Sequence, residues 1–232
     1  MPSEPRRALV TGSSSGIGLA IAEQLLADGW QVTGFDHAEP TLVGAAFSAV
    51  RVDLADGAAA EDAARALPPV QALVHAAGVL RVGSLGHCDA EDADLMWRLH
   101  VAAASRLAEV LVPAMASAGQ GRVVLIGSRV AQGKPGRSQY AASKAALVAL
   151  ARSWAAEVVA RGVTVNVVSP AATQTAMLAD PARAAASPVL PPMGRLIRPA
   201  EIASLVGYLL SPAAAAITGQ EIQICGGASL NR

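Results

Sequence analysis

Short apolar segments alternate along the chain with longer segments whose apolar positions recur every three or four residues. A short continuous apolar run is typical of a buried strand, and the longer period is typical of a helix that turns one face to a core. The pattern predicts seven strands, at 7–12, 31–36, 48–52, 70–78, 121–128, 162–170 and 220–225. It predicts helices at 16–28, 58–66, 90–118, 138–161 and 199–211. Because strands and helices alternate, we expect an α/β fold with one parallel sheet and helices on both of its faces.

The length and composition indicate one globular domain. With 232 residues the chain can bury a large core, and it contains no internal repeat or linker, so we expect residues 1–232 to form a single domain. Hydrophobic residues make up 53% of the sequence and charged residues 16%, and the formal net charge is zero. A chain without excess charge has no tail suited to nucleic acid or to an anionic membrane surface. Neither partner is therefore expected.

The sequence carries no pattern of export, membrane insertion or metal binding. Arg6 and Arg7 precede an apolar run of only three residues, which fits no secretory signal. No apolar run approaches the ~18 residues of a membrane span, so a cytoplasmic location is expected. Cys88 and Cys225 are too few for a disulfide framework, and the His-Cys-Asp run at 87–89 lacks the spacing of a metal site. No metal ion is expected.

The sequence TGSSSGIG, at 11–18, lies between the first predicted strand and the first predicted helix. In this position Gly12 allows a tight turn, Gly16 allows a ligand to approach the backbone, and Gly18 allows the helix to pack closely on the sheet. The unpaired N–H groups at a helix N-terminus attract a pyrophosphate. We therefore predict a dinucleotide site at this turn. The alternative is a turn rich in serine and glycine that binds nothing.

The second predicted strand ends at Asp36, near the distance from the glycine motif at which an acidic side chain hydrogen-bonds an adenosine ribose. A carboxylate at this point would repel a 2′-phosphate. No arginine or lysine stands at 13–15 or at 37–38 to bind such a phosphate. The residues therefore favour NAD over NADP as the cofactor, and a solvated aspartate at a strand end is the alternative.

Tyr140 and Lys144 are four residues apart in a predicted helix, so their side chains share a face and lie about 5–6 Å apart at Cβ. An ammonium group beside a phenol favours the phenolate and lowers the pKa of the phenol from about 10. The pair is suited to proton transfer, although tyrosine and lysine at this spacing also occur on solvated helices.

The chain resembles the short-chain dehydrogenase/reductase family over almost its whole length, in the ordered motifs TGSSSGIG, Asp36, VDL at 52–54, HAAG at 75–78, Ser128, YAASK at 140–144, SPAATQTAM at 169–177 and the glycines at 226–227. The resemblance implies a doubly wound Rossmann sheet. It implies that Tyr140 is the general acid/base, that Lys144 lowers its pKa and holds the nicotinamide ribose, and that Ser128 hydrogen-bonds the substrate oxygen. The cofactor contacts that it implies are Gly12, Ser14, Ser15, Gly16, Ile17, Gly18, Asp36, Asp53, Leu54, Ala76, Ala77, Gly78, Tyr140, Lys144, Pro170, Ala171, Thr173 and Thr175.

Three positions depart from the family pattern. Ser128 stands one residue closer to Tyr140 than is usual, so Gly127 is an alternative for its place. The usual Asn-Asn-Ala-Gly is here the HAAG run at 75–78, which loses two amides that brace the sheet, and we expect this to affect stability more than chemistry. His100 stands where the family often has a catalytic asparagine. We favour a structural or relay role for it over direct acid/base catalysis, although histidine titrates near neutrality and can serve in either.

The leading hypothesis is an NAD-dependent oxidoreductase that interconverts a secondary alcohol and its ketone, with the substrate enclosed by a loop at about 176–198. Two alternatives stay open: an NADPH-dependent reductase of 3-oxoacyl thioesters, and a dinucleotide-binding regulatory protein without turnover. The resemblance also implies that the helices at 90–118 and 138–161 pair between subunits in a homotetramer or homodimer. A monomer stays possible if the sheet already buries these helices.

A polar, basic stretch separates the predicted serine from the predicted tyrosine. It contains Arg129, Gln132, Lys134 and Arg137. Solvated loop residues are the default interpretation of such a stretch. The alternative is that one of these side chains meets a carboxylate or another anionic group of the substrate.

Overall fold

Seven parallel strands form one sheet in the computed structural model, which describes residues 5–176 and 189–230. The strands are β1 (Arg7–Thr11), β2 (Gln31–Asp36), β3 (Phe47–Arg51), β4 (Ala72–His75), β5 (Gly121–Ile126), β6 (Val163–Pro170) and β7 (Glu221–Ile224). Their order is β3-β2-β1-β4-β5-β6-β7, which confirms the predicted doubly wound α/β fold. The order reverses between β1 and β4, and ligands of such sheets bind outside the carboxyl ends of the strands at this point.

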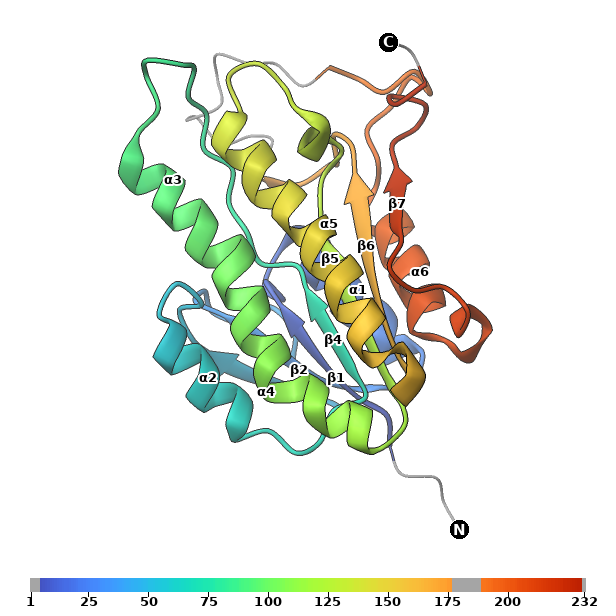
Figure 1. Ribbon diagram of the computed structural model, residues 1–232. Helices are drawn as coiled ribbons and strands as arrows, with labels where there is room; N and C mark the ends of the chain where they lie inside the picture. Colours follow the sequence, from blue (N-terminus) through green and yellow to red (C-terminus); the bar gives the residue numbers. More distant parts are fainter. Residues whose placement is uncertain (1–4, 177–188, 231–232) are drawn as a thin grey trace.

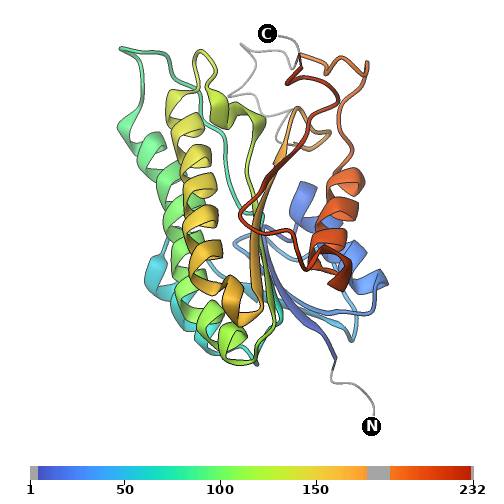
Figure 2. The ribbon, with the colours of Figure 1, turned by 45° about the vertical axis from the view of Figure 1, so that its right-hand side comes forward.

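The helices cover both faces of the sheet (Figures 1 and 2). One face carries α1 (Gly16–Ala27) and α6 (Pro199–Leu210), and the other carries α2 (Gly57–Arg65), α3 (Ala90–Trp97), α4 (Ala103–Ser117) and α5 (Ser138–Val158). Each face has its own apolar core, with Ile21, Leu25 and Val206 on the first and Leu107 and Leu147 on the second. Strands buried on both faces are apolar at successive positions rather than at alternate ones, which is why short apolar runs predicted them.

The predicted long helix at 90–118 is not one regular helix. Between α3 and α4 the chain makes a π-helical turn, Arg98–Ala102, in which His100 and Val101 are buried. The stretch is helical from Ala90 to Ser117, as predicted, but the π turn was not foreseen because one wide turn leaves the overall apolar periodicity almost unchanged. A π turn places an extra residue in the helix and is frequent at functional sites.

Ala90–Ser117 is also the one stretch of the described chain that is long and apolar enough to cross a membrane. Half of an apolar 18-residue segment within it is buried in the fold. A core helix of a globular protein passes the same test of length and composition, so this stretch is weak evidence for a membrane span.

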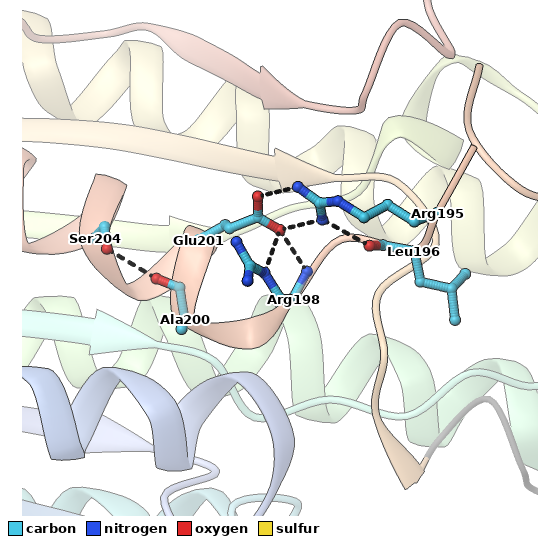
Figure 3. A network of polar contacts seen from close by, with 6 residues as sticks. All are labelled: Arg195, Leu196, Arg198, Ala200, Glu201 and Ser204. Atoms are coloured by element: carbon cyan, nitrogen blue, oxygen red, sulfur yellow. Dashed lines mark hydrogen bonds and ion pairs between the residues drawn. The ribbon is translucent and has the colours of Figure 1, made fainter. Parts of the chain in front are cut away.

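The predicted substrate loop at 176–198 falls mostly on residues 177–188, which lie outside the described residues. Its described end is fixed to the start of α6 by Glu201 (Figure 3). The Glu201 carboxylate accepts hydrogen bonds from both terminal nitrogens of the Arg195 guanidinium, at 2.7 and 2.8 Å, and from the backbone N–H of Arg198 at 2.8 Å. These bonds hold the pKa of Glu201 well below its usual range. The chain therefore enters α6 from a defined direction.

Candidate active site

A cavity of about 510 Å³ lies along the carboxyl ends of the strands. This volume is ordinary for a small-molecule or cofactor site. Residues at the described end of the predicted substrate loop, from Val189 to Pro192, form part of its wall. The cavity brings together nearly all the residues predicted for the site, which are Gly12, Ser15, Gly16, Ile17, Gly18, Asp36, Asp53, Leu54, Ala76, Ala77, Gly78, His100, Ser128, Tyr140, Lys144, Pro170, Ala171, Thr173 and Thr175. Ser14 does not line it.

The glycine turn leaves no room for side chains at its close contacts. A Cβ on Gly12, whose φ is +70°, would lie 2.9 Å from the backbone of Ala77, and one on Gly18 would lie 2.1 Å from the carbonyl oxygen of Gly12. The first helix begins at Gly16, and the side chain of Ser15 makes no capping hydrogen bond to it. The N–H groups of this turn thus keep the positive end of the helix available to an anion. These features fit the pyrophosphate of a dinucleotide.

Asp36 is held rigidly at the end of β2. One carboxylate oxygen accepts a hydrogen bond from the backbone N–H of Ser14 at 2.9 Å, and the other accepts one from Ala38 at 3.0 Å. This explains why Ser14 is not at the cavity wall, since its backbone positions Asp36 instead. The Asp36 side chain is only 11% exposed, and the residue lines the cavity beside Asp53. Carboxylates here can accept hydrogen bonds from ribose hydroxyls.

Ser128, Tyr140 and Lys144 are brought together by β5 and α5. All three are buried. The Lys144 ammonium donates a hydrogen bond of 2.8 Å to the carbonyl oxygen of Ile126 at the end of β5, and its Nζ lies 5.9 Å from the centre of the Tyr140 ring. Ser128 follows β5 directly, and its Oγ accepts a hydrogen bond from the N–H of Val130 at 3.2 Å. Burial lowers the pKa of Lys144 to about 7. Its amine thus changes charge near neutral pH.

His100 uses both of its ring nitrogens inside the protein. Nε2 accepts a hydrogen bond from the N–H of Val79 at 3.1 Å, so the proton belongs on Nδ1. Nδ1 lies 2.9 Å from Oγ of Ser143, to which it donates, and that hydroxyl donates to the carbonyl oxygen of Tyr140 at 2.9 Å. Burial lowers the pKa of His100 well below 6.5, which keeps it neutral. The imidazole therefore connects the loop after β4 to the helix that carries Tyr140 and Lys144.

At His75 the sequence predicted only the loss of an amide side chain that the family has at this position. Its side chain is fully buried. Nδ1 lies 3.0 Å from the hydroxyl of Thr11, and Nε2 lies 3.0 Å from the carbonyl oxygen of Leu99 in the π turn. The Thr11 oxygen accepts hydrogen bonds from the N–H groups of Ala76 and Ala77, both at 3.0 Å, so its proton is donated to His75.

The expectation that this position had lost its bracing of the sheet was incorrect, because a neutral imidazole, like an amide side chain, can both donate and accept a hydrogen bond. His75 joins β1 and β4 to the π turn that carries His100. Burial, with a smaller effect of the Lys144 charge, lowers the pKa of His75 to about 4. The sequence signal for this connection between His75 and the turn of His100 was that the chain has histidine at two positions where the family has asparagine.

A family model described as "Enoyl-(Acyl carrier protein) reductase" matches residues 12–229, a range that includes the glycine turn, Tyr140 and Lys144. The chain belongs to the short-chain dehydrogenase/reductase family. It is 36% identical over 241 residues to the 3-oxoacyl-(acyl-carrier-protein) reductase FabG of Escherichia coli K12, covering 98% of each protein. It is 34% identical over 238 residues to the 2,3-dihydro-2,3-dihydroxybenzoate dehydrogenase of the same organism, covering 95% of this chain and 96% of that protein.

Solved structures of this short-chain dehydrogenase/reductase family superpose along nearly the whole chain. An actinorhodin polyketide ketoreductase variant crystallised with NADPH matches with a TM-score of 0.91 at 29% identity, covering 98% of each chain. A putative NAD(P)-dependent gluconate 5-dehydrogenase from Beutenbergia cavernae with bound NADP matches with a TM-score of 0.88 at 32% identity, covering 97% of each chain. This chain is therefore an oxidoreductase of a family that acts on CH–OH and ketone groups.

No group of three or more histidine, cysteine, aspartate or glutamate side chains is placed to hold a metal ion within residues 5–176 and 189–230. The polar groups at the centre of the site are the hydroxyls of Ser128 and Tyr140 and the amine of Lys144. These groups can donate hydrogen bonds to a substrate oxygen and exchange a proton with it.

Proposed function

We propose that this chain transfers a hydride between NAD(H) and the carbon of a secondary alcohol or its ketone. The observation that carries the proposal is the convergence of Ser128, Tyr140 and Lys144 with the glycine turn and Asp36 in one cavity. A bound nicotinamide cofactor would supply the hydride donor or acceptor. Ser128 polarises the substrate oxygen, Tyr140 exchanges a proton with it, and the amine of Lys144 stabilises the phenolate and holds the ribose.

The first test of this function is the formation of NADH from NAD⁺ with a panel of secondary alcohols, polyols and hydroxy acids, repeated with NADP⁺. In the opposite direction, ketones and 3-oxoacyl thioesters are tested with NADH and NADPH. Turnover with any of these pairs excludes a purely regulatory protein. A protein that binds NADH and turns over no member of the panel would favour the regulatory alternative.

The preference for NAD is proposed from Asp36. Replacing Asp36 with alanine is expected to lower the ratio of kcat/KM for NAD⁺ to kcat/KM for NADP⁺ by about tenfold or more. The reason is that the variant loses a charge-assisted hydrogen bond to the ribose, of about 1.5–3 kcal/mol, together with the repulsion of a 2′-phosphate. Steady-state kinetics with both cofactors measures the ratio.

Asp36→Asn is the matched control for this variant, because its amide oxygen can still accept a hydrogen bond from the N–H of Ser14 or Ala38 while the charge is removed. We expect its cofactor ratio to fall between those of the wild type and the alanine variant. A wild-type enzyme that already prefers NADP⁺ would contradict the assignment of Asp36.

Reduction of a 3-oxoacyl thioester with NADPH is the second candidate, and the comparisons support it better than they support an unspecified alcohol. The relatives of 36% identity are named 3-oxoacyl-(acyl-carrier-protein) reductases, and both solved structures described above contain NADPH or NADP. The proposal of NAD(H) rests on this chain's own Asp36. Reduction of a 3-oxoacyl thioester at a higher kcat/KM with NADPH than with NADH would decide for the second candidate.

The proposal includes a homotetramer or homodimer, formed through α4 and α5. Trp97, the last residue of α3, and Val159, directly after α5, are exposed apolar side chains of the kind that an interface covers. Light scattering of the purified protein measures the oligomeric state.

A further inference from the structure

One histidine lines the adenosine end of the cavity, which is the part lined by Asp36 and residues 52–54. His37 follows Asp36 directly and lies at the cavity wall. The arginines and lysines that line the cavity in the described chain all lie between residues 129 and 144, on or before α5. Histidine is the side chain whose charge changes in the physiological pH range. Among the described lining residues, His37 is therefore the one that can bring a positive charge to the adenosine end.

We propose that His37 is a specificity-determining residue for the cofactor. In its protonated form the imidazole offsets the charge of Asp36 and contacts the 2′-phosphate of NADP, so NADP binds more tightly in mild acid than at alkaline pH. In its neutral form it leaves the carboxylate uncompensated, and NAD is preferred. The inference rests on the proposed function, because it places the adenosine ribose of the cofactor at Asp36.

The side chains of His37 and Asp36 are in direct contact. Nδ1 of His37 lies 3.3 Å from Oδ1 of Asp36. The same oxygen accepts a hydrogen bond from the N–H of Ala38 at 3.0 Å, and Oδ2 accepts one from the N–H of Ser14 at 2.9 Å. These bonds fix the carboxylate, so a charge on the imidazole acts on it at short range. Protonation of His37 thus weakens the negative potential that repels a 2′-phosphate.

The backbone of His37 is held in place while its ring stays accessible. The carbonyl oxygen accepts a hydrogen bond of 3.0 Å from Nε of Arg51, the register partner of Asp36 on β3. The side chain of His37 is 82% exposed, and its Nε2 makes no hydrogen bond to the residues that the structure describes. A protonated imidazole donates from both ring nitrogens. One N–H can therefore face Asp36 while the other donates to a phosphate oxygen.

The other charged groups around His37 do not take over this role. Arg51 forms an ion pair with Glu39, so these two charges cancel. Asp53 lines the cavity beside Asp36 and adds a second negative charge. While His37 is neutral, the adenosine end is therefore negative, which suits ribose hydroxyls and opposes a phosphate. The protonated imidazole removes part of this negative charge at the point nearest to Asp36.

The test measures the Kd of NAD⁺ and the Kd of NADP⁺ by isothermal titration calorimetry at pH 8 and at pH 6, without substrate. We expect the ratio of the Kd for NADP⁺ to the Kd for NAD⁺ to fall by about tenfold from pH 8 to pH 6, as for a hydrogen bond between charged groups. The fall should come mainly from tighter binding of NADP⁺. A phosphate monoester also gains a proton at about pH 6, so part of the fall does not depend on the protein.

His37→Gln separates the two contributions, because glutamine can form hydrogen bonds and carries no charge. We expect the fall in this variant to be at least about threefold smaller than in the wild type. His87→Gln is the matched control, since His87 is an exposed histidine that does not line the cavity, and this variant should show the wild-type fall.

The outcomes distinguish this inference from the proposed function. A fall of equal size in the wild type and in His37→Gln would mean that the phosphate or another group titrates, and it overturns the role of His37. A ratio that does not change with pH overturns it as well, while binding of NAD⁺ leaves the dinucleotide site standing. Binding of neither cofactor at either pH would overturn the dinucleotide site, and with it both the proposed function and the role of His37.

Discussion

Tyr140→Phe is expected to lower kcat/KM for the best alcohol or ketone by about 10²–10⁴-fold, the usual contribution of a positioned general acid/base. The substitution removes only the hydroxyl. The Tyr140 ring packs against Leu80 and Met96 and meets the edge of the His100 ring at a centroid distance of 5.6 Å, and phenylalanine keeps these contacts. Steady-state kinetics measures the loss, while NADH fluorescence and thermal unfolding should show that cofactor binding and stability are retained.

Tyr208→Phe is the matched control for this variant. Tyr208 is the only other tyrosine of the chain, lies on α6 and is 47% exposed. The loss of the Tyr208 hydroxyl should leave kcat/KM within about twofold of the wild type, as expected for a surface substitution away from the site. A Tyr140→Phe enzyme with wild-type turnover would remove the proton-transfer role from Tyr140 and leave the proposed mechanism without its acid/base.

The second large effect is a loss of stability in mild acid, caused by the two buried histidines. In the folded protein, burial lowers the pKa of His75 to about 4 and that of His100 well below 6.5, whereas both titrate near 6.5 in the unfolded chain. Between these values the unfolded chain binds more protons, so the free energy of unfolding falls as the pH falls below about 6.5. From His75 alone we expect a loss of about 3 kcal/mol by pH 4, a large share of the 5–15 kcal/mol of a typical protein.

Urea unfolding at pH 7, 6 and 5 measures this slope. Lys144 contributes only to the upper part of this range, because with a pKa of about 7 in the folded protein its amine is almost fully protonated in both states below about pH 6. The double variant His75→Asn/His100→Asn restores the amides of the family pattern and should show a flatter dependence between pH 6.5 and 5. The same slope in the wild type and in the double variant would mean that other groups cause the loss of stability.

The strands and the shared helix face of Tyr140 and Lys144 could be predicted from the sequence because local pattern determines them. A strand covered on both faces must be apolar along its length, and Tyr140 and Lys144 lie on one helix, where spacing alone defines a shared face. Asp36 was found for a similar reason, since it ends a strand next to the one that carries the glycine turn.

The bonds between segments could not be predicted, because they depend on contacts that no spacing encodes. The three serines of the glycine turn look alike in the sequence, and only the fold directs the N–H of Ser14 to Asp36 instead of to the cavity. The hydrogen bond between His75 and the carbonyl oxygen of Leu99 depends on the π turn. The pattern does not reveal this turn, because its extra residue leaves the apolar period of the helix nearly intact. The sequence showed which amides were missing, and only the fold showed what replaced them.

The close contact between Gly18 and the carbonyl of Gly12 limits how this site can change during evolution. No larger residue fits at either end of that contact, so the turn that is proposed to receive the pyrophosphate is closed to gradual remodelling. Asp36 has no such limit, because other small polar side chains can accept the hydrogen bonds that the two N–H groups donate to it. With Asp36 in its proposed role, a lineage carrying this fold can exchange NAD for NADP by changing the end of a single strand, while inheriting the glycine turn unaltered.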